Sequence, residues 1–568
     1  MRSIVLIAAA LLSLTGCATP TSQPATASAN HAGVPGMVSA ADPRAAEAGA
    51  AMLRKGGSAA DAAIATLVAL NVVEPQSSGI GGGGFLVYRD GSGTIGSYDG
   101  RETAPAAATG TWFYRDGKPL PFSEMQPGGR SVGVPGNVRM MALAHAEHGR
   151  LPWKDLFAPA IALARDGFVM TARMNNALDY GRATGALDAA GRALYYGANG
   201  EPLPVGTRIK NPAMAAFLTR LAEQGPDSFY VGPNGQAIAA KVSGSPVSPA
   251  PMTPGDLASY DAKARDAVCG TYRGYKICGM GPPSSGATTV FAILKQLERF
   301  DMKKLGPDSP KSWHLIAESM RLAYADRGRY LADSDYLPVP VAGLTDPAYL
   351  AKRSLLIDPD HAMATAPVGT PPGAQPMAAG HEAVEHGTSH FVAVDRWGEV
   401  ASLTSTIESA FGSGLVVNGY YLNNELTDFS SVPQENGLAV ANRVEGGKRP
   451  RSSMSPSIVL APDGSVRLAV GAAGGATIIA QVAKAIIGVI DWDLSAQDAI
   501  ALPVLYAPGD TVYLEQGSTQ VAMAPALRAM GHVVDIRSPG FKANAIEWRG
   551  GAWVGAADPR SEGGWVKE

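Results

Sequence analysis

The sequence predicts an α/β protein in which helices cover layers of β-sheet. Strand-like and helix-like segments alternate in both parts of the chain, as they do in layered sheet-and-helix domains. With 568 residues, of which 46% are apolar, the chain can bury a large core as one big domain or two ordinary ones. The composition, with 17% charged residues, favours a globular, soluble protein.

The charge of the chain favours a small substrate. A formal net charge of -3 and a pI near 6.3 give no general attraction to nucleic acid or to an anionic membrane. The sequence contains no long block of like charge. We therefore expect no nucleic-acid partner.

The N-terminus has the pattern of an export signal. Met1-Arg2 precedes the apolar run Ile4 to Leu14, which is too short to span a membrane. The run ends in Leu14-Thr15-Gly16-Cys17, which resembles a bacterial lipoprotein box that is cleaved before Cys17 and lipidated on its thiol. An ordinary signal peptide that contains a cysteine is the alternative. We expect a periplasmic lipoprotein with a signal peptide at 1–16 and a disordered tether at 17–35.

Two further cysteines, Cys269 and Cys278, flank a hairpin-like segment. In an oxidising compartment a local disulfide is the leading interpretation, and two unpaired thiols are the alternative. Their spacing excludes a CxxC metal or redox site.

Two helices are predicted near the start of the folded chain. Asp42-Pro43 provides an N-cap followed by proline at the first helical position, and this helix stops at Gly56-Gly57. Ser58 with Asp61 opens a second helix, which runs through Leu70 and is apolar on nearly all sides. Such a helix must be buried on most sides.

A glycine-rich segment, Ser77 to Phe85, comes next and formally contains GxGxxG. A helix precedes it and a strand, Phe85 to Tyr88, follows, which is the reverse of the order in a dinucleotide-binding motif. We therefore expect the glycines to let backbone pack closely against backbone or ligand. Further along, the predicted hairpins are 87–98 and 457–470, and the predicted helices are 152–164, 312–330 and 478–490.

The segment that begins at Thr388 predicts a hairpin with a defined register. Alternation over its first seven residues suits a half-buried strand, and Asp395-Arg396-Trp397-Gly398 has turn chemistry. If Gly398 takes the left-handed position of a three-residue loop, Thr388 lies opposite Thr406, and the side chains of 388, 406 and 408 share one face. By local pattern alone, a structural cross-strand threonine pair is favoured over a nucleophile.

Short motifs along the chain support the nucleophile. They are Gly56 to Ala63, the glycine run to Phe85, Arg101-Glu102, Pro282 to Gly286, Ala323 to Arg327, Gly387 to His390, Asn423-Asn424, Ser452 to Pro456 and Asp558 to Arg560. Each alone is weak. In this order, from about Gly36 almost to the C-terminus, they resemble the gamma-glutamyltransferase (gamma-glutamyltranspeptidase) family of N-terminal nucleophile (Ntn) hydrolases.

The resemblance implies a four-layer αββα fold that is made as a precursor and cuts itself. The cut falls between Gly387 and Thr388, giving a large subunit of residues 36–387 and a small subunit of residues 388–568. The two subunits pair as a heterodimer and form one composite catalytic domain. We expect no cofactor and no metal.

The implied reaction cleaves γ-glutamyl amide bonds through an acyl-enzyme on Thr388. A threonine hydroxyl needs a base beside it, and the α-amine that the cut releases has a pKa of about 8, close enough to neutral to accept the proton. By resemblance, Thr406 orients Thr388, and Gly474 and Gly475 hold the oxyanion. A tight turn before a helix is the structural alternative for these glycines.

A γ-glutamyl donor presents an amino acid end, so its site must hold a carboxylate and an ammonium group. Arg101, Ser452 and Ser453 match the family's α-carboxylate site, with an ion pair and capping as structural alternatives. Glu408, Glu425 and Asp428 match its α-amine site, where one common version of the pattern has amides at the first two positions. Because close like charges raise a pKa, we predict that one of the three is protonated when substrate is bound.

The segment Ser430 to Arg451 is short for a lid and holds no aromatic residue. We therefore expect an open site that admits glutathione-like and larger donors, with water, amino acids or peptides as acceptors.

Three alternative functions remain open at this point. The first is an acylase of the same fold that removes a glutaryl-type side chain from a β-lactam nucleus, a substrate without the α-ammonium. The second is a metalloenzyme using His381, His386 and His390, whose spacing does not place a second histidine on the helix face of the first. The third is a non-catalytic surface lipoprotein that keeps the fold.

Overall fold

The computed structural model describes residues 31–380, 387–537, 540 and 542–568. The predicted signal peptide, the lipidation site Cys17, most of the tether, and His381 and His386 lie outside the described residues. The predictions that concern them stay predictions.

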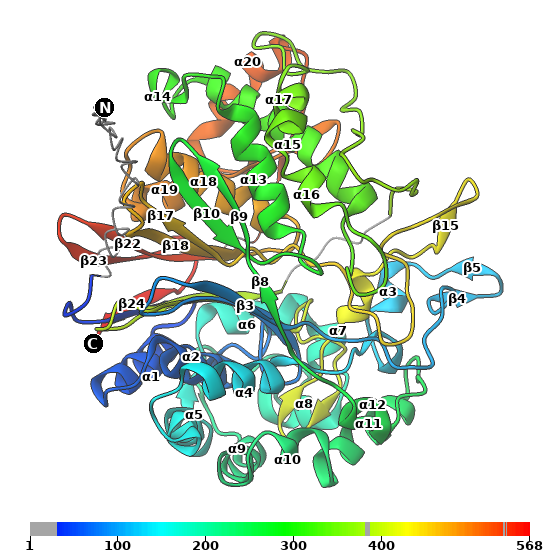
Figure 1. Ribbon diagram of the computed structural model, residues 1–568. Helices are drawn as coiled ribbons and strands as arrows, with labels where there is room; N and C mark the ends of the chain where they lie inside the picture. The colour runs from blue at the N-terminus through cyan, green and yellow to red at the C-terminus, as the bar shows by residue number, and fades with distance from the viewer. Residues whose placement is uncertain (1–30, 381–386, 538–539, 541) are drawn as a thin grey trace, which may run out of the picture.

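Two antiparallel sheets face each other in the middle of the molecule (Figure 1). The seven-stranded sheet has the order β24 (Gly564–Lys567), β1 (Met37–Ala40), β11 (Ser389–Val394), β12 (Val400–Thr406), β2 (Gly83–Arg89), β3 (Ile95–Gly100) and β8 (Lys263–Asp266). The six-stranded sheet has the order β23 (Ala552–Ala557), β22 (Lys542–Arg549), β18 (Val466–Ala473), β17 (Ser457–Leu460), β10 (Tyr275–Gly279) and β9 (Val268–Tyr272).

Helices cover the outer face of each sheet, so the four-layer αββα arrangement is confirmed (Figure 1). The helices on the seven-stranded sheet include α1 (Pro43–Arg54), α2 (Ala59–Val73), α4 (Asn137–His148) and α5 (Ala158–Asp166). Those on the six-stranded sheet include α13 (Gly286–Leu297), α15 (Pro310–Tyr330), α18 (Thr477–Ile490) and α19 (Ala496–Ala501). The described chain holds one large apolar core on each side of the seven-stranded sheet.

Shorter elements surround these layers. The remaining α-helices are α3 (Phe122–Met125), α6 (Ala172–Tyr180), α7 (Arg182–Gly185), α8 (Ala189–Tyr195), α9 (Pro212–Gln224), α10 (Asp227–Tyr230), α11 (Pro233–Ser243), α12 (Pro254–Ala258), α14 (Met302–Leu305), α16 (Val341–Leu344), α17 (Pro347–Ser354) and α20 (Ala524–Ala529). The remaining strands are β4 (Tyr114–Arg115), β5 (Lys118–Pro119), β6 (Phe168–Val169), β7 (Arg208–Ile209), β13 (Val416–Val417), β14 (Tyr420–Tyr421), β15 (Gln434–Glu435), β16 (Leu438–Ala439), β19 (Leu505–Tyr506), β20 (Thr511–Glu515) and β21 (Val533–Arg537).

The helix signals near the start of the chain are confirmed. Asp42 caps α1 by accepting a hydrogen bond from the Arg44 N–H, with proline in the first turn. Ser58 and Asp61 form a capping box at the start of α2, and every residue of that helix is buried. An apolar helix with no solvent face is the expected inner partner of a sheet.

The helix predicted over residues 152–164 is wrong in its first part. Residues Trp153–Phe157 form a 3-10 helix, and the α-helix α5 begins only at Ala158. Pro159 lies in the first turn of α5, where its missing N–H costs nothing, whereas inside a longer helix it would clash with the preceding turn. The proline therefore decides where the α-helix starts.

The hairpin that begins after Thr388 has the predicted register. Ser389 pairs with Ser405 and Val394 with Val400, so residue 388 lies opposite residue 406. The Asp395 N–H donates to the Glu399 carbonyl at 3.2 Å, and Gly398 has a φ of 80°, the left-handed value that the three-residue loop requires.

Both sheets mix strands from the two sides of the 387–388 bond. The seven-stranded sheet takes β1, β2, β3 and β8 from the part before it, and β11, β12 and β24 from the part after it. The six-stranded sheet takes β9 and β10 from the first part and its other four strands from the second. Neither part can complete a sheet alone, which is the composite domain that the resemblance implies.

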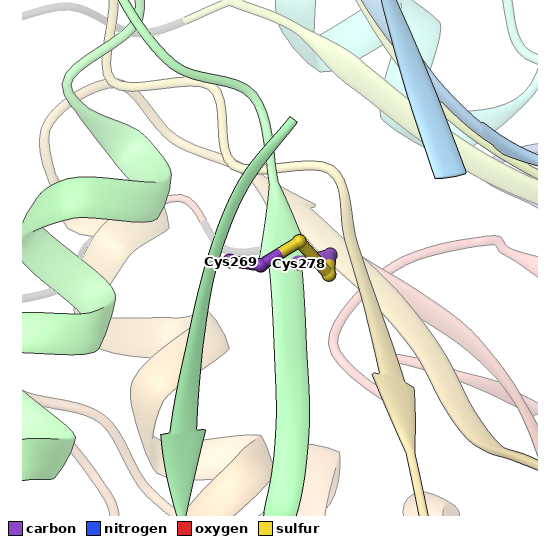
Figure 2. The surroundings of a disulfide bond; sticks show 2 residues. All are labelled: Cys269 and Cys278. Carbon is purple, nitrogen blue, oxygen red and sulfur yellow. A yellow bond between two sulfur atoms is a disulfide. The ribbon is translucent and has the colours of Figure 1, made fainter. Parts of the chain in front are cut away.

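The disulfide between Cys269 and Cys278 is confirmed (Figure 2). The two residues face each other on β9 and β10, with a sulfur–sulfur distance of 2.05 Å. Arg273 and Gly274, both at positive φ, turn the chain between these strands. Among the helices that the structure describes, none combines the length and the apolar character needed to cross a membrane.

Candidate active site

Thr388 and Thr406 meet where β11 begins and β12 ends, on neighbouring strands of the seven-stranded sheet. The Thr388 hydroxyl donates a hydrogen bond to Thr406 Oγ1 at 3.2 Å, and both side chains are buried. Thr406 Oγ1 also accepts the Glu408 N–H at 2.7 Å. The Thr406 oxygen is therefore fixed by the backbone and in turn orients the Thr388 hydroxyl.

The carbonyl oxygen of Ser77 holds the backbone at both threonines. It accepts the N–H of Thr388 at 3.0 Å and the N–H of Ile407 at 3.2 Å. Sequence reasoning missed this role, because a backbone carbonyl leaves no signal in residue type. Its only hint was the glycine run that follows, which brings this loop against the sheet.

Glycine is required where this loop and the residue before Thr388 approach the backbone at the end of β12 and just after it. A Cβ at Gly82 would overlap the carbonyl oxygen of Thr406, and a Cβ at Gly387 would overlap that of Glu408. The close packing expected of the glycine run is confirmed. Gly387 lies so near Glu408 that no side chain fits before Thr388.

Gly474 and Gly475 form the sharp turn between β18 and α18. Their φ angles are 122° and 59°, both in the region that favours glycine. The Tyr324 hydroxyl of α15 donates to the carbonyl oxygen of Ala476, the next residue. β18 packs against β11, with Gly471 against the ring of His390. The turn thus lies past the end of a strand that faces the Thr388 hairpin.

Four buried carboxyl groups gather beside this hairpin: Glu102, Glu408, Glu425 and Asp428. Glu425 and Asp428 belong to a 3-10 helix, Glu425–Asp428, and Glu408 follows β12 in a left-handed conformation with φ of 73°. Asn424 donates its amide to Glu408. Glu102 is an addition to the predicted set.

Burial and like charge raise the pKa values in this cluster. For Glu408, burial is the larger cause and the charge of Asp428 the second, and together they raise its pKa to about 8. Burial also raises the pKa values of Glu425 and Asp428, although the Arg101 charge opposes it. The predicted direction is confirmed, with burial rather than repulsion as its main cause.

Arg101 is bound inside the acidic cluster. Its guanidinium donates to Glu425 and to Asp428, and it also donates to the carbonyl oxygens of Pro450 at 3.1 Å and Arg451 at 3.0 Å. The carboxylate and amine sites that the sequence treated as separate therefore form one network. One guanidinium cannot neutralise four carboxylates, so the cluster keeps an excess of negative charge or of protons.

Ser452 and Ser453 follow the cluster in a segment held by α15. Ser453 Oγ accepts a hydrogen bond from Arg327 Nη2 at 2.8 Å, and Ser452 Oγ accepts the Met454 N–H at 3.1 Å. Because both oxygens act as acceptors, each hydroxyl keeps its own hydrogen to donate. Arg327 also donates to Ser285 Oγ at 2.8 Å, which joins the Pro282 to Gly286 and Ala323 to Arg327 motifs to the site.

Four oxygens of the acidic cluster lack a hydrogen-bond partner within the described part of the chain. They are both carboxyl oxygens of Glu102, Glu408 Oε1 and Glu425 Oε2, and all four are buried. A buried acceptor without a donor is costly, so these atoms favour a ligand that brings N–H groups. An ammonium group fits this need.

The segment 430–451 forms a small exposed hairpin of β15 and β16, seen projecting from the fold in Figure 1. Its base is fixed next to the cluster, where Asn442 donates to the carbonyl oxygen of Asp428 at 2.7 Å. His390 lies in the core, bonded through Nδ1 to Thr404 Oγ1 at 2.8 Å. Burial lowers its pKa to about 3, so it is neutral there.

Comparisons with known proteins agree with this geometry. The gamma-glutamyltranspeptidase family model matches residues 45–567. A glutathione hydrolase proenzyme of Bacillus subtilis (strain 168) is 37% identical over 550 residues, 94% of this chain and 91% of the relative. An acylase ACY 1 proenzyme of Pseudomonas sp. (strain SE83) is 35% identical over 542 residues, 93% and 92% of the two chains. The crystal structure of cephalosporin acylase from Bacillus halodurans has a TM-score of 0.83 at 25% identity, covering 98% of this chain and 99% of that one.

Proposed function

The chain belongs to the gamma-glutamyltranspeptidase family and is an enzyme that cleaves γ-glutamyl amide bonds, and we propose that Thr388 is its nucleophile. The observation that carries the proposal is the bond from the Thr388 hydroxyl to Thr406 Oγ1, immediately after a glycine that admits no side chain. A structural threonine pair explains the bond but not the crowding at Gly387.

The first reaction is the cut that creates the active site. Thr388 Oγ attacks the carbonyl carbon of Gly387, the C–N bond breaks as the nitrogen takes a proton, and an ester forms. The α-amine of Thr388 is now free, and water hydrolyses the ester to release the Gly387 carboxylate and restore the Thr388 hydroxyl. The products are a large subunit ending at Gly387 and a small subunit of residues 388–568.

The α-amine is the base in each later turnover. It accepts the Thr388 hydroxyl proton as Oγ attacks the γ-carbonyl carbon of the donor, and it passes that proton to the departing amine. The N–H groups of Gly474 and Gly475 stabilise the oxyanion, a contribution of about 3 kcal/mol in comparable sites. Water hydrolyses the acyl-enzyme, or an amino acid or peptide accepts the γ-glutamyl group.

The acidic cluster and the serines bind the amino acid end of the donor. The donor ammonium group meets Glu408 Oε1 and Glu425 Oε2, and its α-carboxylate accepts the hydroxyls of Ser452 and Ser453. Arg101 completes the carboxylate site: its guanidinium releases either Glu425 or Asp428 and binds the α-carboxylate of the donor instead. Glutathione and related γ-glutamyl compounds are the donors that fit this arrangement.

A β-lactam acylase is the second candidate, favoured by the similarity to acylase ACY 1 and to cephalosporin acylase. Its glutaryl-type substrates carry no ammonium group, so they would leave Glu408 and Glu425 without donors. Turnover of γ-glutamyl p-nitroanilide and glutaryl p-nitroanilide separates the two functions, with Thr388→Ala as the inactive control. We expect the γ-glutamyl compound to be preferred at least tenfold. Preference for the glutaryl compound would establish the acylase.

We also infer that the protein is exported to the periplasm and anchored through a lipid on Cys17. The lipoprotein-like box in the sequence supports this, and the Cys269–Cys278 disulfide suits an oxidising compartment. Labelling of cells with a palmitate analogue should tag the wild type and not Cys17→Ser. A wild-type protein that takes up no label would overturn the anchor.

A further inference from the structure

A second buried charged cluster adjoins the start of β11, next to Thr388. Lys542, on β22, places Nζ 2.7 Å from Glu74 Oε2, 3.1 Å from Ser389 Oγ and 3.5 Å from Ser77 Oγ. Ser389 Oγ also donates to Glu74 Oε2 at 2.8 Å. Both charged side chains are buried, and the function described above uses neither.

This cluster is joined to the backbone of the nucleophile at two points. Ser77, whose hydroxyl faces Lys542, accepts the Thr388 N–H on its carbonyl oxygen. Ser389 is the next residue of the chain. Lys542 also pairs with Ala473, the last residue before the Gly474 turn. A single lysine thus ties together the start of β11 and the end of β18.

With Arg173 included, the net charge of this cluster is positive. Arg173, on α6, places Nε 3.5 Å from Glu74 Oε1. The single negative charge of Glu74 is therefore shared between two positive side chains, Lys542 and Arg173. Burial lowers the pKa of Lys542 to about 8, and the Glu74 charge opposes that fall. Burial would raise the pKa of Glu74, but Lys542 and Arg173 reverse the effect and hold it below its usual value. Both groups are therefore charged at neutral pH.

We propose that Lys542 and Glu74 are positioning residues that fix the start of β11 and set the proton affinity of the α-amine which maturation creates on Thr388. The inference rests on the proposed function, since only the cut gives Thr388 an amine. After the cut, the Thr388 nitrogen still donates one N–H to the Ser77 carbonyl oxygen. The lone pair of this nitrogen is then free to accept the proton of the Thr388 hydroxyl. A net positive charge nearby disfavours the protonated amine and keeps the base available.

Other titratable groups face this region from each packed element. They are Arg173 and Tyr180 on α6, Asp42 paired with Arg44 at the start of α1, Glu562 bonded to the Arg173 N–H, Glu408 after β12, and the neutral His390 on β11. Lys542 and Glu74 are the charged pair bonded to Ser77 and Ser389, so substitutions there change the amine's environment most directly.

The test is the pH dependence of kcat/KM for γ-glutamyl p-nitroanilide. The acid limb of this profile, where the rate falls as pH is lowered, reports the pKa of the Thr388 amine in the free enzyme. Lys542→Met removes a positive charge and should move the limb to higher pH by roughly one unit. Glu74→Gln removes a negative charge and should move it to lower pH. The double variant restores the wild-type net charge and should return the limb close to its original position, as should Lys542→Arg.

Two further variants guard against structural damage. Arg173 is partly exposed, so Arg173→Met changes the same charge without a buried cavity and should shift the limb upward. Lys484 is another fully buried lysine, but it donates to the carbonyl oxygens of Ile500 and Leu502, and Lys484→Met should leave the limb unmoved. Damage to the fold would lower the rate at every pH without opposite shifts.

Limbs that stay in place, or that move in the same direction in Lys542→Met and Glu74→Gln, would overturn the inference. If the wild type is cut and active but the acid limbs of the variants do not move, this inference alone is refuted. A wild-type chain that is never cut at Thr388 would refute the proposed function instead.

Discussion

Thr388 has a φ of 112°, a value that a β-branched residue rarely adopts. Glu408, two residues beyond Thr406, is also in a left-handed conformation. Such conformations persist only where the surroundings enforce them, and here Thr406, Ser77 and the crowded Gly387 do so. The strained residue is the one whose preceding bond the proposed maturation breaks.

Gly387→Ala should block or greatly slow maturation, because the added Cβ would overlap the Glu408 carbonyl oxygen. The expected product is a folded, uncut chain with at least tenfold lower activity, read from a denaturing gel and the anilide assay. Gly96→Ala is the matched control, since its Cβ would meet open space. Normal cutting of Gly387→Ala would show that the crowding does not matter.

Glu408→Gln should make stability less dependent on pH. The pKa of Glu408 is about 8 in the folded state and about 4.3 when unfolded, so the folded state binds more protons between these values and loses stability as pH rises. The loss is at most about 1.4 kcal/mol per pH unit in this window. Urea unfolding at pH 5 and pH 8.5 measures it. We expect the free energy of unfolding of the variant, relative to that of the wild type, to be higher at pH 8.5 than at pH 5. The same difference between the two proteins at both pH values would refute the raised pKa of Glu408.

At the residue scale, motifs in the sequence named residues that the structure brings together, but not the groups that they contact. Glu408, Glu425 and Asp428 do gather, and Thr388 does meet Thr406. The bonds from Arg101 to two of the acids were not foreseen, because a motif gives a residue type and not the group that it faces. The same holds for Ser77, Lys542 and Arg327, whose partners lie far away in sequence.

At the scale of elements, predictions succeeded where local chemistry decides the structure. The Thr388 hairpin has its register because a left-handed glycine sets the loop and the period of two sets the faces. The capping box at Ser58 opens α2 for an equally local reason. The start of α5 was misplaced because a proline tolerated in the first turn was read as lying inside a helix.

The β9–β10 hairpin should depend on its disulfide for stability rather than for chemistry. Closing a loop of this length stabilises a fold by roughly 2–3 kcal/mol. Replacing Cys269 and Cys278 with alanine should therefore lower the free energy of unfolding by that amount while kcat/KM stays within twofold. Dithiothreitol should destabilise the wild type and leave the double variant unchanged. Equal stability of the two proteins without reductant would contradict this.

At the scale of the whole molecule, the order of strands in the two sheets explains how a cut protein stays in one piece. In the seven-stranded sheet, β1 from before the Gly387–Thr388 bond lies between β24 and β11 from after it, and β12 pairs with β2; both parts also contribute to the six-stranded sheet. Sequence patterns predicted alternating strands and helices, but not which strands neighbour one another. That order depends on tertiary packing, and the resemblance to a family supplied only the four-layer arrangement in advance.

The two subunits should therefore remain associated after maturation. We expect them to elute together from a sizing column in neutral buffer and to separate only under denaturing conditions, because separation would expose strand edges and apolar core. A large subunit that dissociates in neutral buffer would contradict the composite fold.

We expect Thr388 itself to cut the bond that precedes it. Mass spectrometry of the denatured, purified protein tests it most directly. The wild type should give two chains, the smaller beginning at Thr388, and Thr388→Ala should give one uncut, inactive chain. An active enzyme whose chain is uncut, or whose smaller fragment begins at another residue, would contradict the account.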